Sequence, residues 1–129
     1  AMEAERFDAI IQNYANPDMV GHTGKLDATI RACEVIDTCL EQIVRVAEKK
    51  GWTVLLTGDH GNCEQMVDEE TGEPHTYHTT NPVPLVVVGE EWVGSKIRSG
   101  GSFSDVAPTF LDMAEIEAPL EMTGKPLLG

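Results

Sequence analysis

One long amphipathic segment, residues 26–50, constrains the fold of this chain more than any other feature. Its apolar residues recur at steps of three and four, with charged residues between them: Ile30, Cys33, Ile36, Leu40, Ile43, Val44 and Ala47. This spacing places the apolar side chains on one face of an α-helix. Lys49 and Lys50 suit the negative C-terminal end of such a helix, and Gly51 suits its stop. The sequence therefore predicts a helix from Leu26 to Lys50.

Three apolar runs predict strands on either side of this helix. They cover residues 7–14, 52–57 and 82–89. Strands that alternate with helices are typical of a layered α/β fold with a parallel sheet. Three strands make a narrow sheet, and an apolar run such as 83–88 suits the middle of a wider one. We therefore expect adjacent parallel strands with the long helix packed on one face, as a piece of a larger domain.

Local signals predict two shorter helices. Asn16 is placed to cap a helical turn that has Pro17 at its first position. Ser104 is placed to cap a last helix over residues 105–114. Residues 90–102 have no such signals, and we expect an exposed loop there.

Size, charge and cysteine content narrow the class of protein. A chain of 129 residues suits one domain, and no apolar run approaches the roughly 18 residues of a membrane span. The net charge of −13 opposes binding to nucleic acid, anionic membranes or phosphate-bearing substrates, unless metal ions reverse the local sign. The three cysteines argue against a disulfide framework, because Cys33 and Cys39 fall on different faces of the helix. With no signal peptide, we expect a reducing, cytoplasmic setting.

Five side chains of metal-binding type gather where predicted strands begin or end. Asp18 and His22 follow the first strand, Asp59 and His60 follow the second, and His78 precedes the third. Carboxylate and imidazole together suit Mn²⁺, Zn²⁺ or Mg²⁺, and imidazole favours the first two. Two such ions close together clamp the attacking and leaving oxygens of a displacement at phosphorus. Because adjacent residues of an extended segment point to opposite sides, Asp59 and His60 could each serve a different ion.

Plainer roles also suit some of these residues. Asp18 suits the positive end of a helical turn, and His22 beside Gly and Thr suits an exposed loop. His75 lies three residues from His78, and spacing leaves open which of the two is a ligand. Cys63 is a candidate soft ligand, although free cysteines mostly pack as small apolar side chains. The gathering of all four histidines in two loop regions favours a site.

Three motifs in register resemble one enzyme family. They are "NPDMVGHTG" (16–24), "TGDHGNCEQM" (57–66) and "HTYHTTNPVP" (75–84). With "FSDVAPTFLDM" (103–113) and "MTGKPL" (122–127), they resemble the C-terminal, phosphatase-type part of the cofactor-independent (2,3-bisphosphoglycerate-independent) phosphoglycerate mutases. That family is similar in fold to alkaline phosphatase, which implies a parallel sheet flanked by helices.

The resemblance implies a role for each candidate ligand. Asp18, His22 and His78 correspond to the three protein ligands of one Mn²⁺. His78 is preferred to His75 because the family's ligand leads directly into the "TTNPVP" run. Asp59 and His60 correspond to half of a second Mn²⁺ site, so the family pattern assigns both to the same ion. Zn²⁺, Co²⁺ and Mg²⁺ are possible substitutes.

The resemblance also implies an activity for a longer parent protein. The family's nucleophilic serine, one further aspartate ligand and its substrate-gripping arginines and lysine have no counterpart in these motifs. The full-length parent is expected to be a cytoplasmic monomer that interconverts 3- and 2-phosphoglycerate in glycolysis and gluconeogenesis, through a phosphoserine intermediate with two divalent metals.

For this chain itself, we expect one metal-binding domain piece, residues 1–129, that is inactive alone and self-associates through an exposed sheet edge. Two alternatives stay open. One is another alkaline phosphatase-like metalloenzyme, such as a phosphopentomutase or a phosphatase. The other is a non-catalytic metal-binding module.

Overall fold

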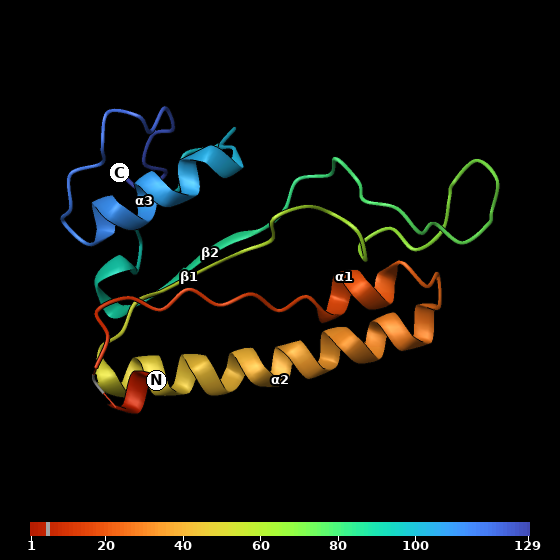
Figure 1. The fold of residues 1–129 in the computed structure, drawn as a ribbon, viewed down its shortest axis with the longest axis horizontal. Coiled ribbons are helices and arrows are strands. Elements are labelled where there is room, and N and C mark those ends of the chain that lie inside the picture. The colour runs from red at the N-terminus through yellow and green to blue at the C-terminus, as the bar shows by residue number, and fades with distance from the viewer. Residues whose placement is uncertain (5) are drawn as a thin grey trace. The chain divides into compact units, whose positions relative to one another are not determined.

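The predicted long helix is present with the expected bounds. In the computed structural model, which describes residues 1–4 and 6–129, helix α2 spans Leu26–Lys50 (Figure 1). Gly51 ends it at φ 68°, where its N–H donates to the carbonyl of Ala47. Only glycine adopts this left-handed conformation without strain, so the sequence sets the end of the helix directly. None of the described helices combines the length and the apolar character that crossing a membrane requires.

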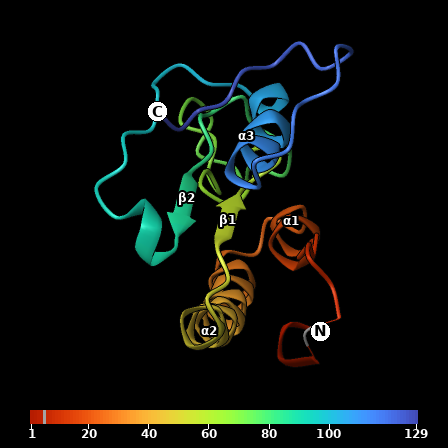
Figure 2. The same cartoon turned by 90° about the vertical axis from the view of Figure 1, so that its left-hand side faces the viewer.

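A short helix packs against α2. Helix α1 spans Asn16–Gly21, and Figures 1 and 2 show it alongside the N-terminal part of α2. Pro17 lies in its first turn, where a missing N–H costs no hydrogen bond. The predicted Asn16 cap was wrong, because Ala15 occupies the N-cap position and Asn16 is already helical.

Two antiparallel strands make the sheet of the described residues. Strand β1 (Val54–Thr57) pairs with β2 (Leu85–Val88), so that Val54 faces Val88 and Thr57 faces Leu85. The predicted parallel pairing was wrong for these strands. A parallel pair needs a crossover, usually a helix, whereas residues 58–84 form no helix and bring the chain directly back beside β1.

The predicted first strand is not formed. Residues 7–14 have no regular secondary structure and lead into α1 (Figure 1). The side chain of Ile11 is 94% exposed and that of Phe7 is 51% exposed. The apolar run therefore finds no sheet partner among the described residues. The described residues therefore form a mixed α/β fold that has a two-stranded sheet.

Strand β1 runs back along α2 toward the end where α1 lies (Figures 1 and 2). A helix rises about 1.5 Å per residue and an extended chain about 3.3 Å. A dozen residues beyond Gly51 are therefore enough to return the chain along most of the helix. Residues 58–63 reach α1 in this way, and this return positions the candidate site.

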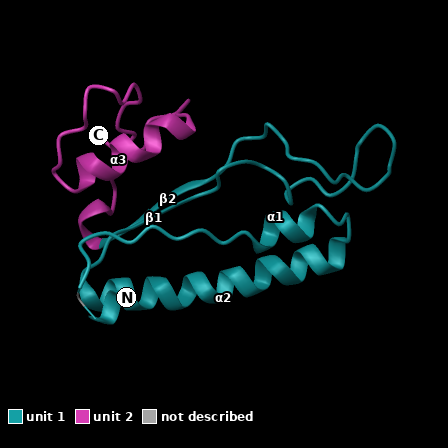
Figure 3. Ribbon diagram, in the orientation of Figure 1, with its two compact units in different colours: residues 1–89 teal, residues 90–129 magenta. Residues whose placement is uncertain are grey.

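Residues 90–129 form a second compact unit, next in sequence to the unit of residues 1–89 (Figure 3). It contains short 3₁₀ helices at Glu90–Trp92 (η2) and Phe103–Asp105 (η3), followed by helix α3, Val106–Met113. The last helix was predicted, but the Ser104 cap was wrong. The N–H of Ser102 donates to Oδ2 of Asp105 at 2.9 Å, so a capping box two residues earlier begins the helical region.

Asp105 joins the C-terminal tail to the helical region of this unit. The residue is 8% exposed, its Oδ1 accepts the N–H of Lys125 at 2.8 Å, and its Oδ2 accepts from Arg98 at 3.2 Å. One turn later, the hydroxyl of Thr109 accepts the N–H of Leu127 at 2.9 Å. The N–H donors of Lys125 and Ser102, together with Arg98, hold the pKa of Asp105 below its usual range.

We predict that Asp105→Asn destabilises residues 90–129 and removes an acid-dependent step. The folded pKa lies below the unfolded value of about 3.9, so the carboxylate stabilises the fold above that value. This stabilisation is lost as the pH falls through the folded pKa. Hydrogen exchange at the Leu127 amide, corrected for its intrinsic rate, should show that loss in the native chain and weaker, flatter protection in the variant.

The exposed Asp112 on α3 provides the matched control for this substitution. Asp112→Asn should leave the protection of Leu127 and its acid step unchanged. Native-like protection in Asp105→Asn would contradict the role assigned to Asp105.

Candidate metal centre

Three predicted ligands meet in a triangle of donor atoms. Asp18 lies in α1, His22 follows the end of α1, and His78 comes from the segment between β1 and β2. His78 Nε2 lies 2.9 Å from Asp18 Oδ1 and 3.1 Å from His22 Nε2, and His22 Nε2 lies 3.2 Å from Asp18 Oδ1. Ligand atoms bonded to one ion at about 2.1 Å stand roughly 3.0 to 3.4 Å apart. The triangle therefore has the size that a single divalent ion requires.

Backbone carbonyls determine which ring nitrogen faces this triangle. Nδ1 of His22 donates to the carbonyl of Thr76 at 2.7 Å, and Nδ1 of His60 donates to that of Gly61 at 3.3 Å. A carbonyl can only accept, so in each neutral ring the proton is on Nδ1 and the lone pair is on Nε2. Metal-binding histidines are commonly oriented by such a bond from the other nitrogen. The donor set therefore fits a divalent ion.

His60 lies against the same triangle. Its Nε2 is 3.9 Å from Asp18 Oδ1, and its ring stacks on that of His78 with centroids 3.7 Å apart. Asp18, His60 and His78 form a second set of three, whose ligand atoms all lie within 4.8 Å of one another. Asp59 Oδ1 is 3.7 Å from His60 Nε2. The structure thus brings Asp18, His22, His60 and His78 together, and Asp59 approaches this group beside its sequence neighbour His60.

The site is open to solvent. The side chains of Asp18, His60, His22 and His78 are 33%, 30%, 41% and 50% exposed, and Asp59 is exposed. An ion or a substrate can therefore reach the donor atoms without a large opening of the fold.

The residues that spacing left ambiguous take other positions. The ring of His75 meets Tyr77 edge-on, with centroids 6.1 Å apart, and its Nδ1 is buried without a hydrogen-bond partner. Cys63 Sγ lies 3.9 Å from the Sγ of Cys33 on α2. His78, and not His75, is the histidine of this loop that contacts Asp18.

Glu64 connects the two loops that carry His60 and His78, a role that the sequence reasoning missed. Its Oε1 accepts from the hydroxyl of Thr79 and from the amide of Asn81 at 3.0 Å, and its Oε2 accepts the N–H of Asn62 at 2.6 Å. Burial by itself would raise the pKa of Glu64, but these bonds outweigh it and hold the pKa below its usual range.

The signal for this connection was present in the sequence. An acid stands four residues after His60 inside "TGDHGNCEQM", and polar residues directly follow His78. The sequence does not show that Glu64 bonds to these residues, because that depends on the two loops lying side by side in the fold.

Two glycines allow the loops to approach each other and α1. Gly61 forms an isolated antiparallel bridge with Thr79, and Gly21 faces Asn62. A Cβ on Gly61 would lie 2.1 Å from Oγ1 of Thr79, and one on Gly21 would lie 1.9 Å from Oδ1 of Asn62. Real atoms do not approach so closely, so any larger residue would displace the side chains of Thr79 or Asn62 from these positions.

Known proteins match this chain over nearly its whole length. Residues 1–118 match the family described as the Metalloenzyme superfamily. The chain is 52% identical over 127 residues to the 2,3-bisphosphoglycerate-independent phosphoglycerate mutase of Rhodopirellula baltica, covering 98% of the chain and 23% of that protein. Proteins of the same name from Pseudomonas putida (53% over 128 residues, 99% and 25% covered) and Clostridioides difficile (49% over 124 residues, 96% and 24% covered) also match. The chain thus spans about a quarter of the length of these curated relatives.

We predict one tightly bound divalent ion per chain. The triangle of Asp18, His22 and His78 supplies three protein ligands, whereas Asp59 and His60 alone supply fewer to a second ion. Calorimetric titration with Mn²⁺ or Zn²⁺ should give one tight equivalent. His22→Ala should weaken it by more than the roughly 10- to 100-fold that loss of a merely orienting partner costs.

His75→Ala is the matched control in this titration and should leave the affinity within about threefold of native, because the ring of His75 packs on Tyr77. Two tight equivalents would contradict the assignment. One tight equivalent whose affinity is unchanged in His22→Ala would contradict it too.

We also predict that Glu64→Gln weakens Mn²⁺ binding although it removes no ligand. The amide places a donor where Oε1 or Oε2 accepted, so the bonds from the side-chain N–H of Asn81 and from the backbone N–H of Asn62 cannot both persist. The affinity should fall about tenfold. Hydrogen-exchange protection of the Thr79 amide, which donates to the carbonyl of Gly61 at 2.9 Å, should fall with it.

Glu69→Gln, a change at an exposed acid of the following loop, should alter neither quantity. Native affinity and native Thr79 protection in Glu64→Gln would show that the connection does not hold the site together.

Proposed function

This chain belongs to the Metalloenzyme superfamily, and from that premise we propose that it is the metal-holding C-terminal part of a 2,3-bisphosphoglycerate-independent phosphoglycerate mutase. Its parent would be an isomerase that interconverts 3- and 2-phosphoglycerate through a phosphoserine intermediate, in the cytoplasm and in glycolysis. One observation carries this proposal: Asp18, His22 and His78 meet at the spacing of one ion. The identity of about 50% to mutases along nearly the whole chain supports it.

Each side chain has a definite part in the proposed site. Asp18, His22 and His78 hold one Mn²⁺, and Asp59 and His60 contribute to a second. Bound divalent ions offset the charge of a phosphoryl group and lower the pKa of an attacking hydroxyl. This matters here because a net charge of −13 by itself repels a phosphate-bearing substrate.

The chain's own contribution is to present lone pairs in a fixed arrangement. The carbonyls of Thr76 and Gly61 hold His22 and His60 in the tautomer that leaves Nε2 bare. Glu64 holds the loops of His60 and His78 together. The attacking serine and the substrate-gripping arginines and lysine belong, in this proposal, to the remaining part of the parent.

Exposed apolar side chains support the view that the parent's sheet is wider. Ile11 is 94% exposed in the run 7–14, and Val86 in β2 is 43% exposed. Apolar residues of this kind are usually covered when strands lie inside a larger parallel or mixed sheet. We infer that run 7–14 is a strand in an alkaline phosphatase-like parent sheet, and that the bare edges allow the isolated chain to pair with a second copy.

We predict that the isolated chain has no mutase activity and that it confers activity within a relative. In a chimera, it replaces the 128 matching residues of the Pseudomonas putida enzyme. An enolase-coupled assay with 3-phosphoglycerate and Mn²⁺ should show turnover by the chimera only. Loss of a positioned nucleophile costs the isolated chain many powers of ten in rate.

Matched chimeras separate the site from general folding. His22→Ala should lower kcat at least about 100-fold, in keeping with the loss of a group that acts directly in the site, and His75→Ala should stay near the parent chimera. A chimera that is folded by circular dichroism but inactive would refute the proposed function. Turnover that persists in the isolated chain after purification to homogeneity would do so as well.

A further inference from the structure

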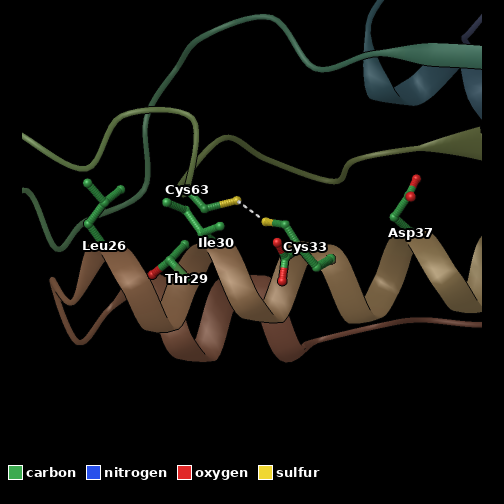
Figure 4. A pocket seen from close by; sticks show the side chains of 7 residues that line it. Leu26, Thr29, Ile30, Cys33, Asp37 and Cys63 are labelled. Atoms are coloured by element: carbon green, nitrogen blue, oxygen red, sulfur yellow. Dashed lines mark hydrogen bonds between the residues drawn. The ribbon is translucent and has the colours of Figure 1, made fainter.

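Two cysteine side chains face each other outside the candidate metal centre. Cys33 projects from α2, and Cys63 lies in the loop that follows β1 (Figure 4). Their Sγ atoms are 3.9 Å apart and point toward each other across a pocket that Leu26 and Ile30 also line. Cys33 is exposed and Cys63 is half-buried.

The third cysteine is excluded from this pair by the geometry of the helix. Cys39 lies six residues beyond Cys33 on α2, about 9 Å along the axis and on a different face. Two cysteines whose Cα atoms are more than about 7 Å apart cannot be bridged without moving the backbone. Helix geometry thus excludes a bridge between Cys33 and Cys39, whereas the sulfurs of Cys33 and Cys63 lie 3.9 Å apart.

We propose that Cys33 and Cys63 form a thiol–disulfide exchange site that low-molecular-weight disulfides, such as oxidised glutathione, convert to a protein disulfide. Bond formation requires the Sγ atoms to close from 3.9 Å to about 2.05 Å. The proposal requires rotation about the Cα–Cβ bonds, with a small shift of the loop around Cys63, to cover this distance. Helix α2 keeps Cys33 in place meanwhile.

The reaction proceeds in two exchanges that balance. The Cys33 thiolate attacks one sulfur of oxidised glutathione, the S–S bond breaks, and one glutathione thiolate leaves. The Cys63 thiolate then attacks Cys33 Sγ in the mixed disulfide and displaces the second glutathione. Two protein thiols are oxidised, one glutathione disulfide is reduced to two thiols, and the two protons end on those thiols.

Exposure sets the order of the two exchanges. Cys33 is open to solvent, so a bulky disulfide can reach its sulfur. Burial, with the neighbouring Cys33 adding to it, raises the pKa of the Cys63 thiol. Cys63 therefore reacts second, as the resolving thiol, after the mixed disulfide has brought a good leaving group beside it.

The disulfide would join α2 to the loop that carries Asp59 and His60. Cys63 is only three residues beyond His60, and the link would close a loop of 30 residues. The inference does not rest on the proposed function, because it uses neither the ligands nor their ion.

Peptide mapping of the oxidised chain tests the proposal. The reduced chain is incubated with oxidised glutathione in the presence of EDTA, alkylated, and digested with trypsin and a glutamate-specific protease. Glu34 lies between Cys33 and Cys39, so the digest separates these two cysteines. We expect the thiols of Cys33 and Cys63 to disappear together and a peptide that contains Cys33 to be linked to one that contains Cys63. Stable separate mixed disulfides, links between two chains, or a link through Cys39 would overturn it.

Two variants test the order of the steps. In Cys63→Ser, the mixed disulfide at Cys33 should accumulate because no thiol resolves it. In Cys39→Ser, the matched control from the same helix, the Cys33–Cys63 link should form within about twofold of the native rate, as for an independent site. A folded Cys63→Ser chain without adduct at Cys33, or loss of the link in Cys39→Ser, would also overturn the proposal. The mapping of the native chain decides it even where a variant fails to fold.

Discussion

The candidate site depends on the contacts of one carboxylate oxygen, Oδ1 of Asp18. Oδ1 of Asp18 lies 2.9 Å from the Nε2 of His78, 3.2 Å from that of His22 and 3.9 Å from that of His60. Lone pairs at such distances repel one another unless a proton or a cation lies among them. The surrounding fold must therefore hold them in place. The packing of α1 on α2 and the hydrogen bonds of Glu64 do this.

The antiparallel pairing of β1 and β2 explains why the histidines meet. In an antiparallel pair, the end of the first strand lies beside the start of the second, and Thr57 indeed faces Leu85. His60 follows β1 by three residues and His78 precedes β2 by seven, so both fall at the same end of the sheet. A parallel pair would have put the start of β2 at the opposite end of β1. The antiparallel pairing, which was predicted wrongly as parallel, is thus the feature that brings His60 and His78 together.

The loop after β1 serves both the candidate metal centre and the cysteine pair. Within "TGDHGNCEQM", His60 contacts the triangle, Cys63 faces α2, and Glu64 holds the loop of His78. Adjacent side chains of a tight loop point in different directions, which lets a few residues make contacts with a helix, a second loop and a ligand set. Because Cys63 and His60 lie in the same loop, oxidation of Cys63 would act on the segment that positions His60.

The sequence by itself determined the features that depend on local contacts. The bounds of α2 follow from side-chain spacing and from Gly51, because helical hydrogen bonds join residues four apart. The five candidate ligands followed from motif and residue type. Only the tertiary structure decided the direction of strand pairing, the exposed course of residues 7–14, and the pairing of Cys33 with Cys63. These depend on contacts between residues far apart in the chain, and such contacts are set by how the whole chain returns upon itself, which no local pattern encodes.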